Sequence, residues 1–133
     1  MVENVAVYFV NYSGFVLMLR DRYTRNWMTP GGCVEPGESA FESTTREFLE
    51  ETSSKFPTNY VVAKRWLWRG KTAVFLVFSR EYLTPFTKTS ETCGRRFFHY
   101  SEIQNVQNMR SCVKNSFSDL NISAEVESFL STV

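Results

Sequence analysis

Residues 30–51 read PGGCVEPGESAFESTTREFLEE, a glycine turn followed at once by a segment rich in acids. The turn at Pro30, Gly31 and Gly32 breaks regular structure and lets the backbone approach a ligand closely. Ser39 and Glu42 fit a capping box, which predicts that a helix begins there. This stretch therefore predicts a loop that leads directly into an acidic helix.

The acids of the expected helix crowd one another. Residues three and four apart are neighbours on a helix, so Glu47, Glu50 and Glu51 repel unless a cation lies among them. A solvated, salt-bridged face is the alternative, but only one arginine, Arg46, stands among the four acids. We expect these acids opposite the core side of the helix. A modest inward stripe is expected at Phe41, Thr45, Phe48 and Thr52.

Length and composition limit the possible classes of protein. A chain of 133 residues can bury the core of one domain, and 43% hydrophobic with 22% charged residues is ordinary for a soluble protein. The formal net charge of +1 gives no overall field to attract a polyanion. We therefore expect neither duplex DNA nor a membrane as a partner.

The three cysteines and the first residues predict a reducing, cytoplasmic location. Cys33, Cys93 and Cys112 are odd in number, widely separated and without a metal-ligand spacing, so neither a zinc site nor a disulfide framework is expected. Residues 1–10 lack a basic leader and a cleavage site, and their apolar run is too short to span a bilayer.

Apolar runs predict a mixed sheet between helices. Two runs joined by a Gly14 turn predict a hairpin of central strands, and the polar residues 21–27 predict a loop. Helical spacing near residues 109–120 predicts a second helix, with another short helical turn near residues 126–130. The expected strands are residues 5–10, 15–20, 61–68, 72–78 and 95–100.

The spacing within the acidic stretch resembles the Nudix box of the Nudix hydrolase family. Five residues separate Gly32 from Glu38, seven separate Glu38 from Arg46, and the run Arg-Glu-Phe-Leu-Glu-Glu follows in register. A long spaced pattern of this kind is far more specific than a lone glycine motif. The resemblance implies one domain over residues 1–133, with a Nudix-like α/β/α sandwich and a mixed sheet.

Two positions depart from the family pattern. Ser53 and Ser54 stand where the box has a glycine and an apolar residue, so the usual left-handed helix stop lacks its glycine. Either the serine adopts that conformation at some cost, or the helix ends differently. No candidate catalytic group is lost.

The resemblance implies a metal-dependent hydrolase that cleaves a phosphoanhydride bond. Mg²⁺ or Mn²⁺ would be held by a backbone carbonyl near Gly31 or Gly32 and by several acids. Those acids are Glu47, Glu50 and Glu51, with Glu91 as the candidate from a later loop.

The remaining roles also follow from the resemblance. Glu47 or Glu50 would accept the proton of the attacking water, with no way to choose between them. Arg46 would orient Glu47, and Glu38 would support the loop or the arginine.

Candidates for substrate binding lie outside the box. Guanidinium and ammonium groups pair well with phosphate oxygens, and two tryptophans on one strand face could stack a nucleobase or join the core. Together with Glu38, these candidates are Arg65, Trp66, Trp68, Arg69, Lys71, Arg95 and Arg96.

The substrate stays open. Nucleoside triphosphates, dinucleoside polyphosphates and 5′-capped RNA all fit a nucleoside diphosphate-linked substrate. A diphosphoinositol polyphosphate phosphohydrolase is an alternative, and it requires three basic pairs, 64–65, 69–71 and 95–96, to converge. A nucleotide-binding Nudix module without turnover is a second alternative, motivated by Ser53 and Ser54.

Overall fold

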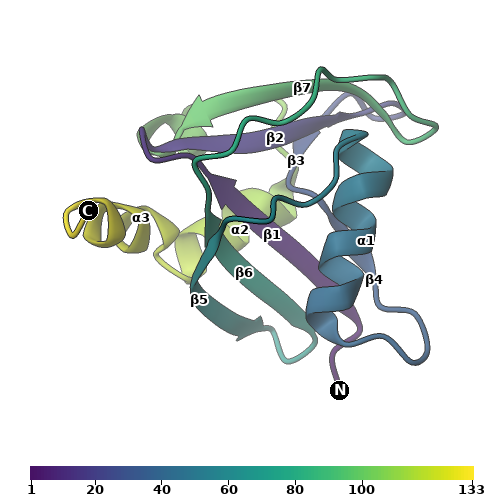
Figure 1. The fold of residues 1–133 in the computed structure, drawn as a ribbon, viewed down its shortest axis with the longest axis horizontal. Coiled ribbons are helices and arrows are strands. Elements are labelled where there is room, and N and C mark those ends of the chain that lie inside the picture. The colour runs from purple at the N-terminus through teal and green to yellow at the C-terminus, as the bar shows by residue number, and fades with distance from the viewer.

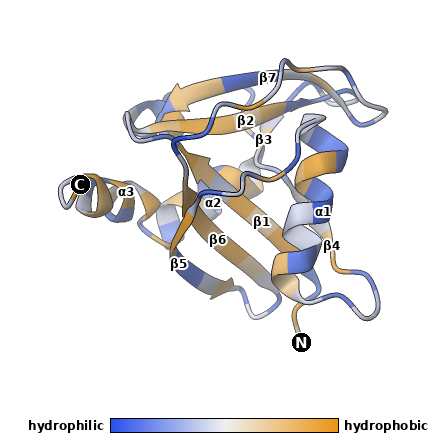
Figure 2. Cartoon of the chain, in the orientation of Figure 1, coloured by the Kyte–Doolittle hydropathy of each residue, from blue (hydrophilic) through white to orange (hydrophobic).

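The centre of the sheet is a parallel pair of strands. In the computed structural model, which describes residues 1–133, β1 (Asn4–Val10) and β6 (Thr72–Phe78) pair along their full lengths. Both are rich in β-branched and aromatic residues and are buried almost throughout, as expected of strands covered on both faces. Figure 2 shows their hydrophobic colouring.

Five further strands complete a seven-stranded mixed sheet. β5 (Val61–Trp68) pairs antiparallel with β6, and β4 (Gly31–Cys33) pairs antiparallel with β1. β2 (Phe15–Asp21) carries β3 (Trp27–Met28) on one side and β7 (Thr92–His99) on the other. In Figure 1, β2 and β7 lie above the remaining strands.

Helices cover both faces of the sheet (Figure 1). Phe48 of α1 (Ala40–Thr52) packs on side chains such as Val7 and Phe9 on one face. On the other face, residues of η1 (Tyr100–Asn105), α2 (Ser111–Asp119) and α3 (Ile122–Leu130) join a second core cluster. The predicted α/β/α sandwich with a mixed sheet is therefore confirmed. No helix combines the length and apolar character needed to cross a bilayer.

Several predicted elements need correction. β1 and β2 are joined as expected, but their only register pair is Val10 with Val16, because β1 pairs instead with β6 and β4. The predicted break at the diglycine contains strand β4, and residues 27–28 form β3. β7 begins at Thr92, three residues earlier than predicted, and the C-terminal turn is the nine-residue helix α3.

The orientation of α1 also differs from the prediction. Glu47 and Glu51 are buried, whereas Thr45 is only partly buried. The acids therefore do not lie opposite the core: two of them face the strand that carries the glycines. The helix ends at Ser53, which adopts the left-handed conformation (φ 64°) and donates its N–H to Leu49 O at 3.1 Å. Of the two possibilities left open, serine taking the usual stop is the one observed.

Candidate active site

The capping box fixes where α1 begins. Ser39 Oγ accepts from Glu42 N at 3.1 Å, and Glu42 Oε1 accepts from Ser39 N at 2.8 Å, as the sequence predicts. Both contacts satisfy backbone N–H groups that a helix start leaves free. The helix therefore starts at Ala40, eight residues after Gly32, and packs beside β4.

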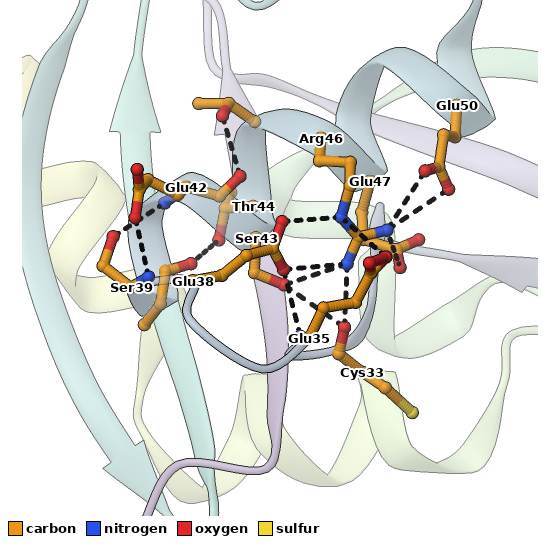
Figure 3. Close-up of polar contacts among 12 residues, drawn as sticks. Cys33, Glu35, Glu38, Ser39, Glu42, Ser43, Thr44, Arg46, Glu47 and Glu50 are labelled. Carbon is orange, nitrogen blue, oxygen red and sulfur yellow. Dashed lines mark hydrogen bonds and ion pairs between the residues drawn. The ribbon is translucent and has the colours of Figure 1, made fainter.

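A guanidinium gathers four of the acids. Arg46 Nε donates to Glu38 at 2.8 Å, and Arg46 Nη1 donates to both Glu47 and Glu50 at 3.1 Å. Arg46 Nη2 donates to the Cys33 carbonyl at 3.0 Å, which ties the helix to β4 (Figure 3). Glu35 lies 3.3 Å from Arg46 Nε. We call these residues the Arg46 cluster: Glu35, Glu38, Arg46, Glu47 and Glu50.

Charge compensation shifts the pKa values within this cluster. Hydrogen bonds from Arg46 lower the pKa of Glu38, and the hydrogen bond with Glu38 is the main reason that the pKa of Arg46 is raised. Glu38 also accepts the N–H of Glu35 at 3.0 Å. Its carboxylate therefore contacts both the loop and the arginine.

A second group of acids lies beside the first. Carboxylate oxygens of Glu47, Glu51 and Glu91 lie within 4.8 Å of one another, although Glu91 comes from the segment before β7. We call these three residues the carboxylate trio. Glu51 is 4% exposed and Glu47 8% exposed, and neither Glu51 nor Glu91 forms an ion pair with a basic residue.

Burial dominates the electrostatics of the trio. Desolvation raises the pKa of Glu51 to about 9 despite its hydrogen bond from Gly31, and desolvation also raises the pKa of Glu47. The neighbouring carboxylates raise both pKa values further. Arg46 pairs with Glu47 but with neither of the other two acids, so the ionised form of this trio requires further positive charge.

The two glycines bring backbone against the acids. Gly31 N donates to Glu51 Oε1 at 2.8 Å. A Cβ atom at Gly32 would lie 2.5 Å from Glu47 Oε1, so a side chain there would displace the carboxylate. Oxygen donors of this kind are the ligands that Mg²⁺ and Mn²⁺ prefer. The carboxylates of the trio therefore fit a hard divalent cation.

A cavity of about 270 Å³ opens beside the trio. Glu51, Gly31 and Gly32 line it together with Trp68, so it connects the acids to an aromatic wall. Trp68 Nε1 donates to Asp119 Oδ2 at 2.9 Å, and the guanidinium of Arg69 lies 4.3 Å from the Trp68 ring. Other side chains that line the cavity are Met28, Arg110, Cys112 and Ser116.

The remaining substrate-binding candidates do not gather at this cavity. Trp66 packs on the α2 and α3 core, and Arg65 lies over the Phe75 ring on β6. Lys71 is exposed in the turn after β5. The three basic pairs do not converge. The pair at 64–65 lies on β5 and the pair at 69–71 at its end, across the sheet from the pair at 95–96 on β7 (Figure 1).

The basic pair on β7 has other surroundings. Arg95 lines a separate cavity of about 600 Å³, and its buried Nη1 has no hydrogen-bond partner. Arg96 is exposed, with its guanidinium 5.0 Å from the Phe98 ring.

Sequence reasoning missed several residues that shape the site. Asp119 and Arg110 lie at the two ends of α2, and Met28 belongs to the short strand β3. None of them belongs to a spaced motif: α2 brings Arg110 to the cavity and Asp119 to Trp68, and β3 brings Met28. The helical spacing near residues 109–120 was the one sequence signal that pointed to this region.

Comparison with known proteins identifies the family. The model of the NUDIX domain matches residues 2–118. The chain belongs to this family. The matched region contains α1, the glycine strand β4 and all three members of the carboxylate trio.

The proteins that this chain resembles are named for different activities. The chain is 46% identical over 50 residues to a putative 8-oxo-dGTP diphosphatase of Bacillus subtilis (strain 168), a match that spans 38% of this chain and 34% of that protein. The structure resembles a C. elegans Ap4A hydrolase with a TM-score of 0.71, at 13% identity over 98% of this chain and 100% of that chain. It also resembles the Bacillus subtilis pyrophosphohydrolase BsRppH with a TM-score of 0.69, at 23% identity over 96% of this chain and 82% of that chain.

Proposed function

We propose that this protein is a metal-dependent pyrophosphohydrolase that cleaves a phosphoanhydride bond in a nucleoside diphosphate-linked substrate. One observation carries the proposal: three carboxylates from two separate segments converge within 4.8 Å beside a glycine strand, with too little positive charge to balance them. Membership of the NUDIX family supports the same reaction class.

Mg²⁺ or Mn²⁺ is the proposed cofactor. Glu51, Glu91 and a backbone carbonyl near Gly31 or Gly32 would hold it, with Glu47 beside them. When bound, the ion supplies positive charge that neutralises phosphate oxygens and activates water for attack on phosphorus. The burial of Glu51 and Glu47 excludes competing water from these ligands.

Glu47 is the better proton acceptor of the two candidates. Its Oε1 accepts from Arg46, which fixes the direction of the carboxylate, and burial raises its pKa towards the working pH. Glu50 is more exposed, with 49% of its side chain accessible, and it lies outside the trio. In this proposal Glu38 and Arg46 orient Glu47, while Glu50 contributes charge near the ion.

The cavity beside the trio would receive the nucleoside. Glu51 and the glycines form its wall nearest the trio, so a base in the cavity would direct its phosphates towards the acids. The ring of Trp68 is held by Asp119 and Arg69, which gives a fixed surface for stacking. Nucleoside triphosphates, dinucleoside polyphosphates and capped RNA all carry this base and phosphate arrangement.

The diphosphoinositol alternative has less support. A densely phosphorylated inositol requires several cations in one pocket. Arg69 pairs instead with Asp119 at 3.7 Å, and Lys64 pairs with Glu125 at 3.1 Å.

A cytoplasmic location belongs to the same proposal and is supported by three free cysteines, Cys33, Cys93 and Cys112.

A screen of phosphoanhydride compounds tests the function. Nucleoside triphosphates, dinucleoside polyphosphates, capped RNA and a diphosphoinositol polyphosphate are each offered with Mg²⁺ or Mn²⁺. We expect metal-dependent phosphate or nucleotide release from at least one nucleotide substrate, its loss in Glu51→Gln, and its retention in Glu127→Gln, which changes an exposed acid on α3. Turnover that is unchanged in Glu51→Gln, or that needs no metal, would overturn the proposal.

A further inference from the structure

Ser53 makes a contact that the family's glycine cannot make. It ends α1 in the left-handed conformation, as a glycine would, but its hydroxyl also donates to the carbonyl of Thr87. Thr87 belongs to the segment between β6 and β7, 34 residues further along the chain. The departure from the box therefore joins the end of α1 to the segment that precedes Glu91.

Ser54 contacts the same segment. It is buried, and its Oγ accepts from the backbone N–H of Thr84 at 3.3 Å. An apolar residue, as the family pattern has here, would leave that N–H without its acceptor. The hydrogen bond is partly buried although Thr84 itself is exposed, so the serine adds a modest stabilisation to this path of the segment.

Thr92 supplies a third contact at the other end of the segment. Its buried hydroxyl donates to Glu51 O at 2.7 Å, and because a hydroxyl has one proton, Thr89 Oγ1 must donate to Thr92 Oγ1 at 2.8 Å. Thr89 Oγ1 in turn accepts the N–H groups of Glu91 at 3.2 Å and Thr92 at 2.9 Å. These bonds fix the backbone on both sides of Glu91.

Glu91 depends on this backbone for its position. Its side chain is exposed and makes no hydrogen bond or ion pair, so nothing beyond the main chain directs it towards Glu51. Arg22, the residue after β2, holds the same turn, since its N–H donates to Glu91 O at 2.9 Å and its guanidinium donates to Thr89 O. Loss of one contact between α1 and this segment should therefore shift Glu91 away from Glu51 only in part, because Arg22 still holds the turn.

We propose that Ser53, Ser54 and Thr92 are positioning residues that clamp the Glu91 segment onto the end of α1 and thereby complete the metal site. This inference rests on the proposed function, because it assigns Glu91 to the same ion as Glu51. It gives the two serines, which break the family pattern, a role in placing Glu91. We call these three residues the α1 clamp.

Ser53→Gly distinguishes a role in placing Glu91 from a role in the stability of the fold. Glycine adopts positive φ at no steric cost, so thermal unfolding should be unchanged or slightly raised. The affinity for Mn²⁺, measured by electron paramagnetic resonance, should fall about tenfold, as for other residues that orient metal ligands. Asn121→Gly is the matched control, since Asn121 has φ 50° and its side chain makes no capping bond. Its Mn²⁺ affinity should equal that of the wild type.

A double-mutant cycle tests whether Ser53 acts through Glu91. Glu91→Gln should weaken Mn²⁺ binding, and adding Ser53→Gly to it should cause no further loss. Equal Mn²⁺ affinity in Ser53→Gly and wild type, or fully additive losses in the double variant, would overturn the clamp while leaving the proposed function intact. A wild-type protein that binds no Mn²⁺ would overturn both.

Variants of Thr92 test the clamp independently of Ser53. Thr92→Ser keeps the hydroxyl and should keep Mn²⁺ affinity close to that of the wild type, whereas the isosteric Thr92→Val should lower it. Equal affinities in these two variants would contradict the clamp.

Discussion

The same helix, α1, holds acids in two contrasting environments. In the Arg46 cluster, the carboxylates share one guanidinium through hydrogen bonds and ion pairs of 2.8–3.3 Å. In the carboxylate trio, Glu51 and Glu91 have no basic partner, and burial raises the pKa of Glu51 to about 9. Only Glu47 belongs to both groups. The acids that share the Arg46 guanidinium hold the loop in place, whereas the acids without a basic partner leave room for a cation.

The largest effect is expected from Glu51→Gln. Glutamine keeps the shape but not the charge, so the site loses its most buried anionic ligand. We expect kcat/KM to fall more than about 100-fold, beyond the usual effect of a residue that only supports a ligand. Steady-state hydrolysis of the best substrate from the screen measures this. A loss below tenfold would place Glu51 outside the metal site.

Arg46→Ala should have the next largest effect, which is chiefly a loss of stability. It removes the guanidinium that donates to Glu38, Glu47 and the Cys33 carbonyl. The free energy of unfolding in urea should drop by about 1–3 kcal/mol. Arg46→Lys restores the charge but not the forked geometry, so it should recover only part of the loss. Full recovery in Arg46→Lys would show that charge alone organises the Arg46 cluster.

The effect of pH on stability should be smaller than the effects of these two substitutions, and stability should fall as the pH rises. Without metal, the folded protein keeps a proton on Glu51 that the unfolded chain releases near pH 4.5, because the folded pKa is about 9. The midpoint temperature in a chelating buffer should therefore fall as the pH rises from about 5 to 9. Glu51→Gln should reduce this fall, and Mg²⁺ should reverse it in the wild type only. A midpoint that rises over this range would contradict the raised pKa.

Glu50→Gln should have the smallest effect. Its half-exposed carboxylate contacts Arg46 and lies outside the trio. We expect less than about a tenfold loss in kcat/KM, since it acts beside the ligands and not as one. A loss as large as that of Glu51→Gln would return Glu50 to the metal ligands, as the family resemblance implies.

The sequence predicted the box and the central layers because both depend on local spacing. The capping box at Ser39 and Glu42 is confirmed, and the apolar runs of β1, β5 and β6 lie where they were expected. The burial of Glu47 and Glu51 was not predicted, since the pairing of β4 with β1 decides which side of α1 meets the sheet. A two- or three-residue strand has too few residues to show a period.

The cavity could not be predicted from local patterns. Trp68 was a candidate, but its partner Asp119 is 51 residues away, and Arg110 reaches the site only through the packing of α2. Glu91 was a candidate because the family resemblance implies a further acid from a later loop. Its proximity to Glu51 arises from the threonine and serine contacts of the α1 clamp, which no periodicity reveals.

Anomalous diffraction from crystals soaked in Mn²⁺ tests the central claim most directly. The account predicts a manganese peak among the carboxylates of Glu47, Glu51 and Glu91, next to the backbone of Gly31 and Gly32, and no such peak in Glu51→Gln crystals. A fully soaked wild-type crystal with no manganese at the trio, or with manganese bound by the Arg46 cluster through Glu38 and Glu50 instead, would contradict it.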